Sequence, residues 1–105
     1  MLRLMSNGQR AMDLGCGSGI NLPYLLERYR TAVGVDYRKG AMIAKRKGAL
    51  PVLGDAECLP FQDGSFQFVL CSEMIEHLEN PGKMLAEINR VLCPGGRVLI
   101  TTPNH

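Results

Sequence analysis

The chain has 105 residues, 46% of them hydrophobic and none of them tryptophan, which fits a single small α/β domain spanning residues 1–105. Its net charge of +2 is too small to indicate a nucleic-acid partner, and no apolar stretch is long enough for a membrane span. The four cysteines, Cys16, Cys58, Cys71 and Cys93, form no CxxC pair and lie in or beside apolar runs, which predicts buried thiols in a reducing cytoplasm.

Short apolar segments alternate along the chain with segments of helical periodicity. The predicted strands are residues 10–14, 31–35, 50–53, 66–71 and 97–102, and the predicted helices are residues 20–29, 39–47 and 83–92, with a helical turn in 73–78. Pro51 cannot donate to a ladder, so the third strand is expected at an edge, and residues 93–96 are expected to form a turn. The alternation predicts a doubly wound, Rossmann-like parallel sheet with helices on both faces.

Three glycines, Gly15, Gly17 and Gly19, lie between the first predicted strand and the first predicted helix. Because glycine weakens regular structure, such a cluster indicates that a ligand approaches the main chain closely. Ligands of doubly wound sheets bind outside the carboxyl ends of the strands, where this loop is expected. Asp36 ends the second strand, and a carboxylate there can accept hydrogen bonds from both hydroxyls of a ribose. The two features together indicate a ligand that contains a nucleoside.

The spacing of the glycines disfavours two common nucleotide-binding loops. The dinucleotide fingerprint GxGxxG would need a glycine at the position of Ile20. A phosphate-binding P-loop would need Lys followed by Ser or Thr, and no such pair follows the glycines. A dinucleotide-dependent oxidoreductase is therefore the less favoured interpretation.

Four segments resemble, in order and spacing, the motifs of class I S-adenosylmethionine-dependent methyltransferases. They are Asp13–Gly19 for the glycine loop, Val33–Asp36 for the acidic end of the second strand, Gly54–Phe61 for the adenine-binding loop, and Phe66–Leu78 with Leu92–Gly96 for the fourth strand and its sequel. Within that family, the chain is most similar to the group that includes ubiquinone and menaquinone biosynthesis methyltransferases. The resemblance implies the strand order 3-2-1-4-5 and S-adenosyl-L-methionine as the cofactor.

The resemblance also implies a role for each matching residue. The three glycines would lie against the methionine part of the cofactor, Asp13 would face its ammonium group, and Asp36 would hold the ribose hydroxyls. From the residues alone, Asp13 could equally cap the turn that follows it. The full set predicted to contact the cofactor is Asp13, Gly15, Cys16, Gly17, Gly19, Asp36, Tyr37, Asp55, Ala56, Cys71 and Ser72.

The adenine and methyl ends of the cofactor would be held by later segments. The resemblance implies that Asp55 accepts a hydrogen bond from the adenine amino group and that the N–H of Ala56 lies near the ring. It also implies that Cys71 and Ser72 border the sulfonium and its methyl group. Two alternatives stay open, because Asp55 could merely cap its loop and Cys71 could belong to the core.

Methyl transfer from a sulfonium is an in-line displacement, in which the protein mainly aligns the nucleophile with the methyl group and excludes water. A base is needed only when the nucleophile carries a proton that must leave. The candidate bases are Glu73, Glu76 and His77, which a helix would place on one face. This pattern also resembles part of the metal site of small-RNA 2′-O-methyltransferases, so a divalent ion is an alternative. A solvated acidic helix is the third interpretation.

The chain departs from the family pattern at its end, because it stops just after the fifth strand, before the last hairpin of the family. The fifth strand is then expected to be an exposed edge carrying Val98, Leu99 and Ile100, which a second copy or a partner chain would cover. The favoured interpretation is a methyltransferase core that acts on a small molecule, by C- or O-methylation. A non-catalytic cofactor-binding module or a partner-dependent subunit is the alternative.

Overall fold

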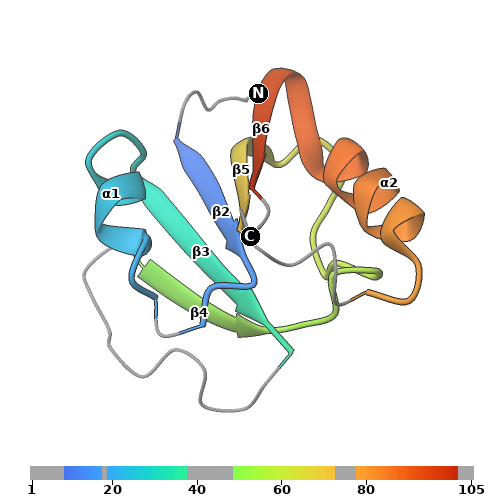
Figure 1. Cartoon of the computed structure of the whole chain (residues 1–105). Coiled ribbons are helices and arrows are strands. Elements are labelled where there is room, and N and C mark those ends of the chain that lie inside the picture. Colours follow the sequence, from blue (N-terminus) through green and yellow to red (C-terminus); the bar gives the residue numbers. More distant parts are fainter. Residues whose placement is uncertain (1–8, 18, 38–48, 73–77, 102–105) are drawn as a thin grey trace.

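The computed structural model of the chain describes residues 9–17, 19–37, 49–72 and 78–101. These residues form one parallel sheet of five strands, β2 (Arg10–Leu14), β3 (Thr31–Asp36), β4 (Ala49–Leu53), β5 (Phe66–Ser72) and β6 (Leu92–Thr101), and the helices α1 (Leu22–Leu26) and α2 (Pro81–Val91) (Figure 1). The strand order is β4-β3-β2-β5-β6. The predicted order 3-2-1-4-5 and the doubly wound α/β fold are therefore confirmed.

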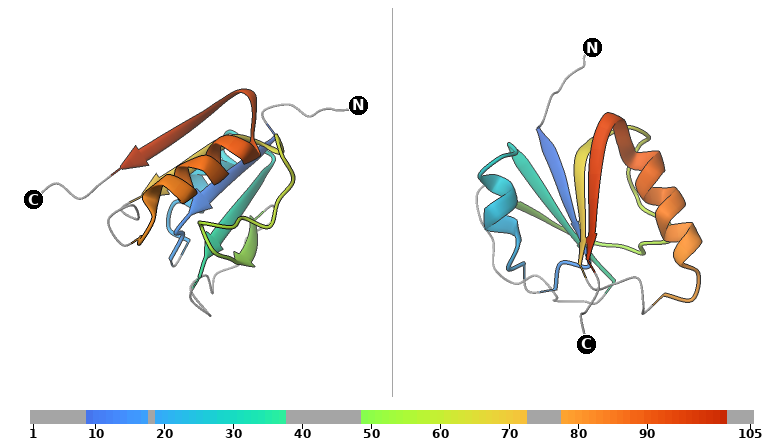
Figure 2. Two further views of the ribbon diagram at one scale, coloured as in Figure 1. Left: turned by 90° about the vertical axis from the view of Figure 1, so that its right-hand side faces the viewer. Right: turned by 45° about the horizontal axis from the view of Figure 1, so that its top comes forward.

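The two described helices lie on opposite faces of the sheet (Figure 2). Successive side chains of a strand point to opposite faces, and β2 shows this directly. Ala11 belongs to the hydrophobic cluster that contains the α1 side chains Leu22 and Leu25, whereas Met12 and Leu14 belong to the cluster that contains the α2 side chains. The central strand is therefore buried on both faces, as parallel sheets in α/β proteins require.

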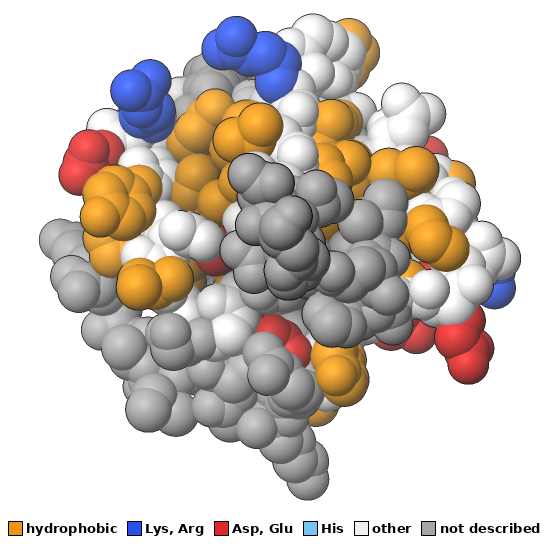
Figure 3. Space-filling model, in the orientation of Figure 1, with side chains coloured by type: hydrophobic (Ala, Val, Ile, Leu, Met, Phe, Trp, Pro, Cys, Tyr) orange, Lys and Arg blue, Asp and Glu red, His pale blue; other side chains and the backbone are white. Residues whose placement is uncertain are grey.

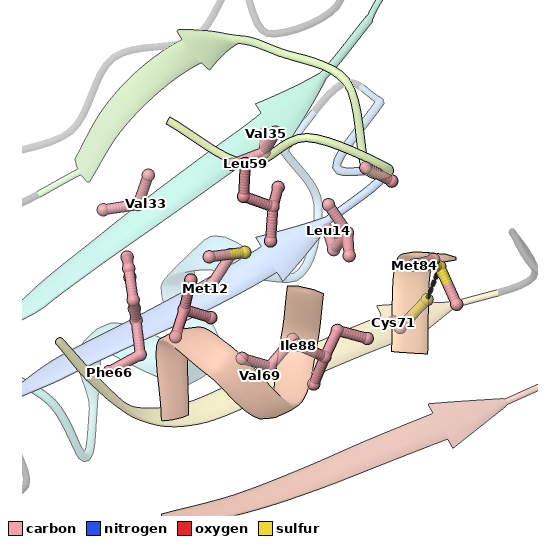
Figure 4. Close-up of a cluster of buried hydrophobic side chains, with 12 residues drawn as sticks. Met12, Leu14, Val33, Val35, Leu59, Phe66, Val69, Cys71, Met84 and Ile88 are labelled. Atoms are coloured by element: carbon pink, nitrogen blue, oxygen red, sulfur yellow. Dashed lines mark hydrogen bonds between the residues drawn. The ribbon is translucent and has the colours of Figure 1, made fainter. Parts of the chain in front are cut away.

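The larger core lies between the sheet and α2 (Figure 4). The α2 side chains that enter it are Met84, Ile88 and Val91, which recur at helical spacing and are all buried. Phe66 is also buried there and meets Phe61 edge to face, with 5.0 Å between ring centroids. Burial of these aliphatic and aromatic side chains holds α2 against the sheet.

Helix α1 is shorter than the helix predicted for residues 20–29. It has Pro23 in its first turn, where a missing N–H costs little, but it ends at Leu26. The N–H groups of Glu27 and Arg28 donate to carbonyls three residues earlier, at 3.3 and 3.1 Å, which tightens the chain in the manner of a 3₁₀ turn. The chain can then reverse its direction and enter β3 at Thr31.

Helix α2 begins at Pro81, two residues before the predicted start of that helix at residue 83. Asn80 acts as the N-cap, because its side-chain Oδ1 accepts a hydrogen bond from the N–H of Lys83 at 3.3 Å. Pro81 then occupies the first helical position, where a missing N–H costs little. The Asn80-Pro81-Gly82 segment therefore starts the helix.

The predicted turn at residues 93–96 is wrong, because this segment is part of β6. Phe66 of β5 pairs with Leu92 and Phe68 pairs with Arg97, so two steps along β5 correspond to five steps along β6. The surplus residues of β6 form a wide irregularity in the ladder. Gly95 lies within this irregularity with a φ of 81°, a backbone conformation that is common in turns. The irregularity therefore has the proline and glycine composition of a turn.

Strand β4 lies at one edge of the sheet, as Pro51 predicts, and β6 lies at the other. Val98 and Leu99 of β6 are 41% and 52% exposed, whereas Ile100 is partly buried against the larger core. Hydrophobic side chains also show at the surface of the face drawn in Figure 3. The prediction of an exposed apolar edge is therefore confirmed for Val98 and Leu99 and not for Ile100.

Part of the prediction lies outside the described residues. This applies to the helix expected at residues 39–47, to Thr102, and to residues 73–77 of the expected helical turn. Within the part of the chain that the structure describes, neither helix is long and apolar enough to span a membrane.

Candidate functional site

The glycine loop is attached to the end of β3 through the main chain. The N–H groups of Gly15 and Cys16 both donate to the carbonyl oxygen of Val35, at 2.7 and 3.1 Å. The N–H of Gly17 donates to Oδ2 of Asp36 at 2.9 Å. The loop predicted to carry the amino-acid end of a ligand and the carboxylate predicted to hold its ribose are therefore in direct contact.

All three glycines of the loop have positive φ values, 80° for Gly15, 54° for Gly17 and 85° for Gly19. Residues with a Cβ rarely adopt this region of backbone conformation. The loop therefore needs glycine at each of these positions, and it presents main chain rather than side chains next to the carboxyl ends of β2 and β3.

Asp13 is a fully buried carboxylate, and neither of its oxygens has a hydrogen-bond partner among the residues that the structure describes. Burial, and secondly the negative charge of Asp36, raise its pKa to about 6. Side chains an even number of residues apart in a strand point to the same face of the sheet. Asp13 lies two residues after Ala11 in β2, and Asp36 lies four residues after Ala32 in β3. Because both alanines pack in the cluster that contains the α1 side chains, both carboxylates project to the α1 face. Two buried acids on one face form a strongly negative site, which favours a cationic ligand.

Asp36 is itself only 4% exposed, and it closes the second strand at the predicted place. Its main-chain carbonyl accepts a hydrogen bond from the N–H of Gly54 at 2.9 Å. The hydrogen bond places Gly54, where the predicted adenine loop begins, beside Asp36, the predicted ribose contact. Tyr37, the residue after the end of β3, is 69% exposed.

The predicted adenine loop is a tight turn whose two named residues face different ways. Asp55 is exposed, its Oδ1 accepts from the N–H of Glu57 at 2.9 Å, and its carbonyl accepts from the N–H of Cys58 at 2.9 Å. The capping interpretation of Asp55 therefore describes a contact that exists, and a contact with adenine stays a prediction. The side chain of Ala56 is buried in the larger core, so only its main chain is available to a ligand.

Cys71 and Ser72 were predicted to border the methyl group together, but they lie on opposite faces of the sheet. The thiol of Cys71 is fully buried in the larger core, where it lies 3.7 Å from the sulfur of Met84 (Figure 4). Burial, and secondly the charge of Asp13, raise the pKa of Cys71 to about 11, so this thiol is protonated at neutral pH. Ser72 lies four residues after Phe68 in β5, so its side chain points to the same face as that of Phe68. This is the α1 face, to which the two carboxylates also project.

The candidate bases or metal ligands Glu73, Glu76 and His77 lie outside the described residues. The prediction that all four thiols are buried is wrong for Cys58, which is exposed in the adenine loop, and only half right for Cys93, which is partly exposed. An apolar neighbourhood in the sequence does not imply burial when the residue lies in a surface turn.

Glu87 and Arg90 of α2 were not among the site residues predicted from the sequence. Oε1 of Glu87 accepts a hydrogen bond from the N–H of Leu59 at 2.7 Å, and the guanidinium of Arg90 donates to the carbonyl of Leu59 at 2.9 Å. The helix therefore holds the segment that follows the adenine turn. The only signal in the sequence is an acid and a base three residues apart, which ordinarily indicates a surface ion pair.

Comparison with known proteins identifies the family. A family model described as a methyltransferase domain matches residues 12–100. The chain belongs to the methyltransferase domain family. Its membership confirms the class I S-adenosylmethionine-dependent family predicted from the sequence, and the dinucleotide-dependent alternative loses its support.

Three relatives show how far the similarity extends. The ubiquinone biosynthesis O-methyltransferase of Methylococcus capsulatus is 32% identical over 93% of this chain and 45% of its own length. The phthiotriol/phenolphthiotriol dimycocerosates methyltransferase 1 of Mycobacterium ulcerans is 39% identical over 90% of this chain and 38% of its own. A chain from the complex between the Haloferax volcanii Trm112 methyltransferase activator and a proposed methyltransferase superposes with a TM-score of 0.79 at 30% identity, covering 89% of this chain and 44% of that one. The chain thus spans less than half the length of these relatives.

Proposed function

We propose that residues 1–105 act as the cofactor-binding domain of an enzyme that transfers a methyl group from S-adenosylmethionine to a small molecule. The observation that carries the proposal is Asp13, a buried carboxylate that lies beside the buried Asp36 and whose two oxygens have no partner in the described part of the chain. The cofactor has an ammonium group that would compensate Asp13 and a ribose diol that would bind Asp36. The residues present therefore fit this cofactor.

Each part of the site would do a distinct task in the reaction. The cofactor supplies an activated methyl group, so the chain has to bind it, orient it and exclude water. The glycine loop would seat the amino-acid end against main chain, and Asp36 would fix the ribose. Ser72, on the α1 face with both carboxylates, would lie at the methyl end in place of the Cys71 thiol, which is buried in the core.

For the acceptor we infer a small organic molecule that is methylated on carbon or oxygen. The relatives support this class, since one is named a ubiquinone biosynthesis O-methyltransferase and another a demethylmenaquinone methyltransferase, the latter from Renibacterium salmoninarum. We propose a reducing cytoplasm as the compartment, because none of the four cysteines forms a disulfide.

A partner-dependent subunit is the second candidate, and one observation favours it. Val98 and Leu99 leave an apolar edge on β6, which a second copy or another chain would cover. The Haloferax volcanii complex, in which a related chain occurs with a methyltransferase activator, supports the idea that proteins of this fold work with partners. In that case cofactor would bind to the isolated chain and turnover would need the partner.

The experiment that tests the proposed function is calorimetric titration of the chain with S-adenosylhomocysteine. We expect binding in the micromolar range for the wild type. Asp36→Ala should weaken it by on the order of 2 kcal/mol, about thirtyfold, because charge-assisted hydrogen bonds to the ribose are lost. Glu27→Ala is the matched control, since that acidic side chain is exposed just after the end of α1, away from the glycine loop. Equal affinities for the wild type and Asp36→Ala would overturn the ribose assignment.

A further inference from the structure

The last two turns of α2 hold the segment that follows the predicted adenine turn. The guanidinium of Arg90 donates to the carbonyl oxygens of Leu59 and Phe61 at 2.9 and 2.7 Å, and to Oδ1 of Asp63 at 2.8 Å. It also donates to both carboxylate oxygens of Glu87, at 2.8 and 3.0 Å. Oε1 of Glu87 in turn accepts from the N–H of Leu59. Leu59 is therefore bound at both its N–H and its carbonyl.

This clamp acts on a segment that is already fixed at its other end. The N–H of Gly54 donates to the carbonyl of Asp36, where β3 ends. Between Gly54 and Leu59 the chain makes the single tight turn that carries Asp55, and Ala56 and Leu59 are both buried in the larger core. The position of the Asp55 carboxylate thus depends on two anchors, β3 on one side and the Glu87–Arg90 pair on the other.

The electrostatics of the pair favour a rigid anchor. Hydrogen bonds from Arg90 lower the pKa of Glu87, and hydrogen bonds to Glu87 and Asp63 raise the pKa of Arg90, so both members of the pair are charged at neutral pH. The side chain of Glu87 is 19% exposed and that of Arg90 is 31% exposed, whereas that of Asp63 is 83% exposed. Solvent therefore screens the contact with Asp63 most strongly, and the main-chain contacts are the important ones.

We propose that Glu87 and Arg90 are positioning residues for recognition of the nucleobase: they hold Leu59, and through it the Asp55 turn, at the place where the adenine amino group is read. The inference rests on the proposed function, because it needs an adenosyl ligand. It differs from a purely structural role in what it predicts. Loosening the clamp should weaken discrimination between nucleobases, and it should leave the glycine loop and Asp36 in place.

The test compares two ligands, S-adenosylhomocysteine and its deaminated analogue S-inosylhomocysteine, by calorimetric titration. The analogue carries a carbonyl oxygen where adenine has its amino group, so it cannot donate to Asp55 from that position. We expect the wild type to prefer the adenosyl ligand by about tenfold or more. Arg90→Met should lower the affinity for the adenosyl ligand about tenfold and change the affinity for the inosyl ligand by less than about threefold, so that the preference is nearly lost.

Further variants make the result decisive. Arg90→Lys keeps the charge but not the fork of donors, so it should restore part of the preference. Arg28→Met, at an exposed arginine beyond α1, is the matched control and should leave both affinities unchanged. Glu87→Gln decides the matter if Arg90→Met does not fold, and it should also reduce the preference. An unchanged preference in the folded variants would overturn the inference, whereas failure of the wild type to bind either ligand would remove the proposed function itself.

Discussion

Asp13 is the residue whose environment departs most from the ordinary. Among the described residues neither oxygen of this buried carboxylate has a hydrogen-bond partner, which is costly. Its pKa of about 6 means that the group is ionised at neutral pH but holds its proton to a higher pH than an exposed aspartate does. Such an arrangement is typical of a binding site, where an oppositely charged ligand compensates the group. The motif in the sequence was sufficient to predict that Asp13, the glycines and Asp36 lie together, because these positions depend on local strand–loop geometry.

The pKa of Asp13 leads to a prediction about stability. Its value is about 6 in the folded chain and near 3.8 in the unfolded chain, so between these values the folded state binds more protons. The free energy of unfolding should therefore fall as the pH rises from about 4 to about 6, and then level off. Since one pKa unit corresponds to about 1.4 kcal/mol, the contribution of Asp13 is roughly 3 kcal/mol.

Urea denaturation of the unliganded chain at pH 5 and at pH 7.5 measures this effect. Asp13→Asn is the control, because the amide keeps the shape of the side chain and does not titrate in this range. We expect Asn to stabilise the unliganded chain at pH 7.5 relative to the wild type, and to weaken cofactor binding. A wild type whose stability changes with pH in the same way as that of Asp13→Asn would contradict the account.

The sequence alone did not predict which face of the sheet the side chains of Cys71 and Ser72 point to. Cys71 and Ser72 are neighbours, and one of them must face the core, but which one depends on the register of the whole strand. The ladder is irregular between Phe66 and Phe68, which resets the alternation after the first residues of β5. The contacts of Glu87 and Arg90 with Leu59 were invisible for a related reason, since they join segments about thirty residues apart.

At the scale of elements, the buried strands were predicted well and the boundaries less well. A short apolar run such as Ala11–Leu14 identifies a strand because both of its faces are covered. The start of α2 and the end of α1 depend instead on individual hydrogen bonds at Asn80 and at Glu27, which periodicity does not report. The irregularity at Gly95 has the composition of a turn, and only pairing with β5 makes it part of a strand.

The contact between α2 and the sheet gives a prediction at this scale. Met84 is fully buried in the larger core beside Cys71. Met84→Ala should lower the free energy of unfolding by about 2–5 kcal/mol, because it removes buried methylene groups and leaves a cavity. Leu85→Ala, one residue along the same helix at a position that is 42% exposed, is the matched control and should cost much less. Equal losses for the two variants in urea denaturation would show that α2 does not dock as described.

At the scale of the whole molecule, the exposed edge of β6 is the principal liability. Strand β6 pairs with β5 on one side and has no neighbouring strand on the other among the described residues. With Val98 and Leu99 exposed, it offers hydrogen-bonding groups and apolar surface to another chain. The chain spans less than half the length of the three relatives compared above.

We expect the 105-residue chain to associate with itself through this edge as its concentration rises. Leu99→Lys places a charge on the edge and should shift the chain towards the monomer, because charged side chains prevent edge-to-edge pairing. Arg97→Lys, an exchange of like charge on the same strand, should leave the association unchanged. Sedimentation velocity over a range of concentrations measures this, and a wild type that stays monomeric throughout would contradict the prediction.

The most direct test of the central claim is a crystal structure of the chain with S-adenosylhomocysteine. The account predicts that the ligand lies across the carboxyl ends of β2 and β3, with both ribose hydroxyls within hydrogen-bonding distance of Asp36 and the ammonium group on the side of Asp13. A ligand bound elsewhere, or one bound there with its ribose turned away from Asp36, would contradict it.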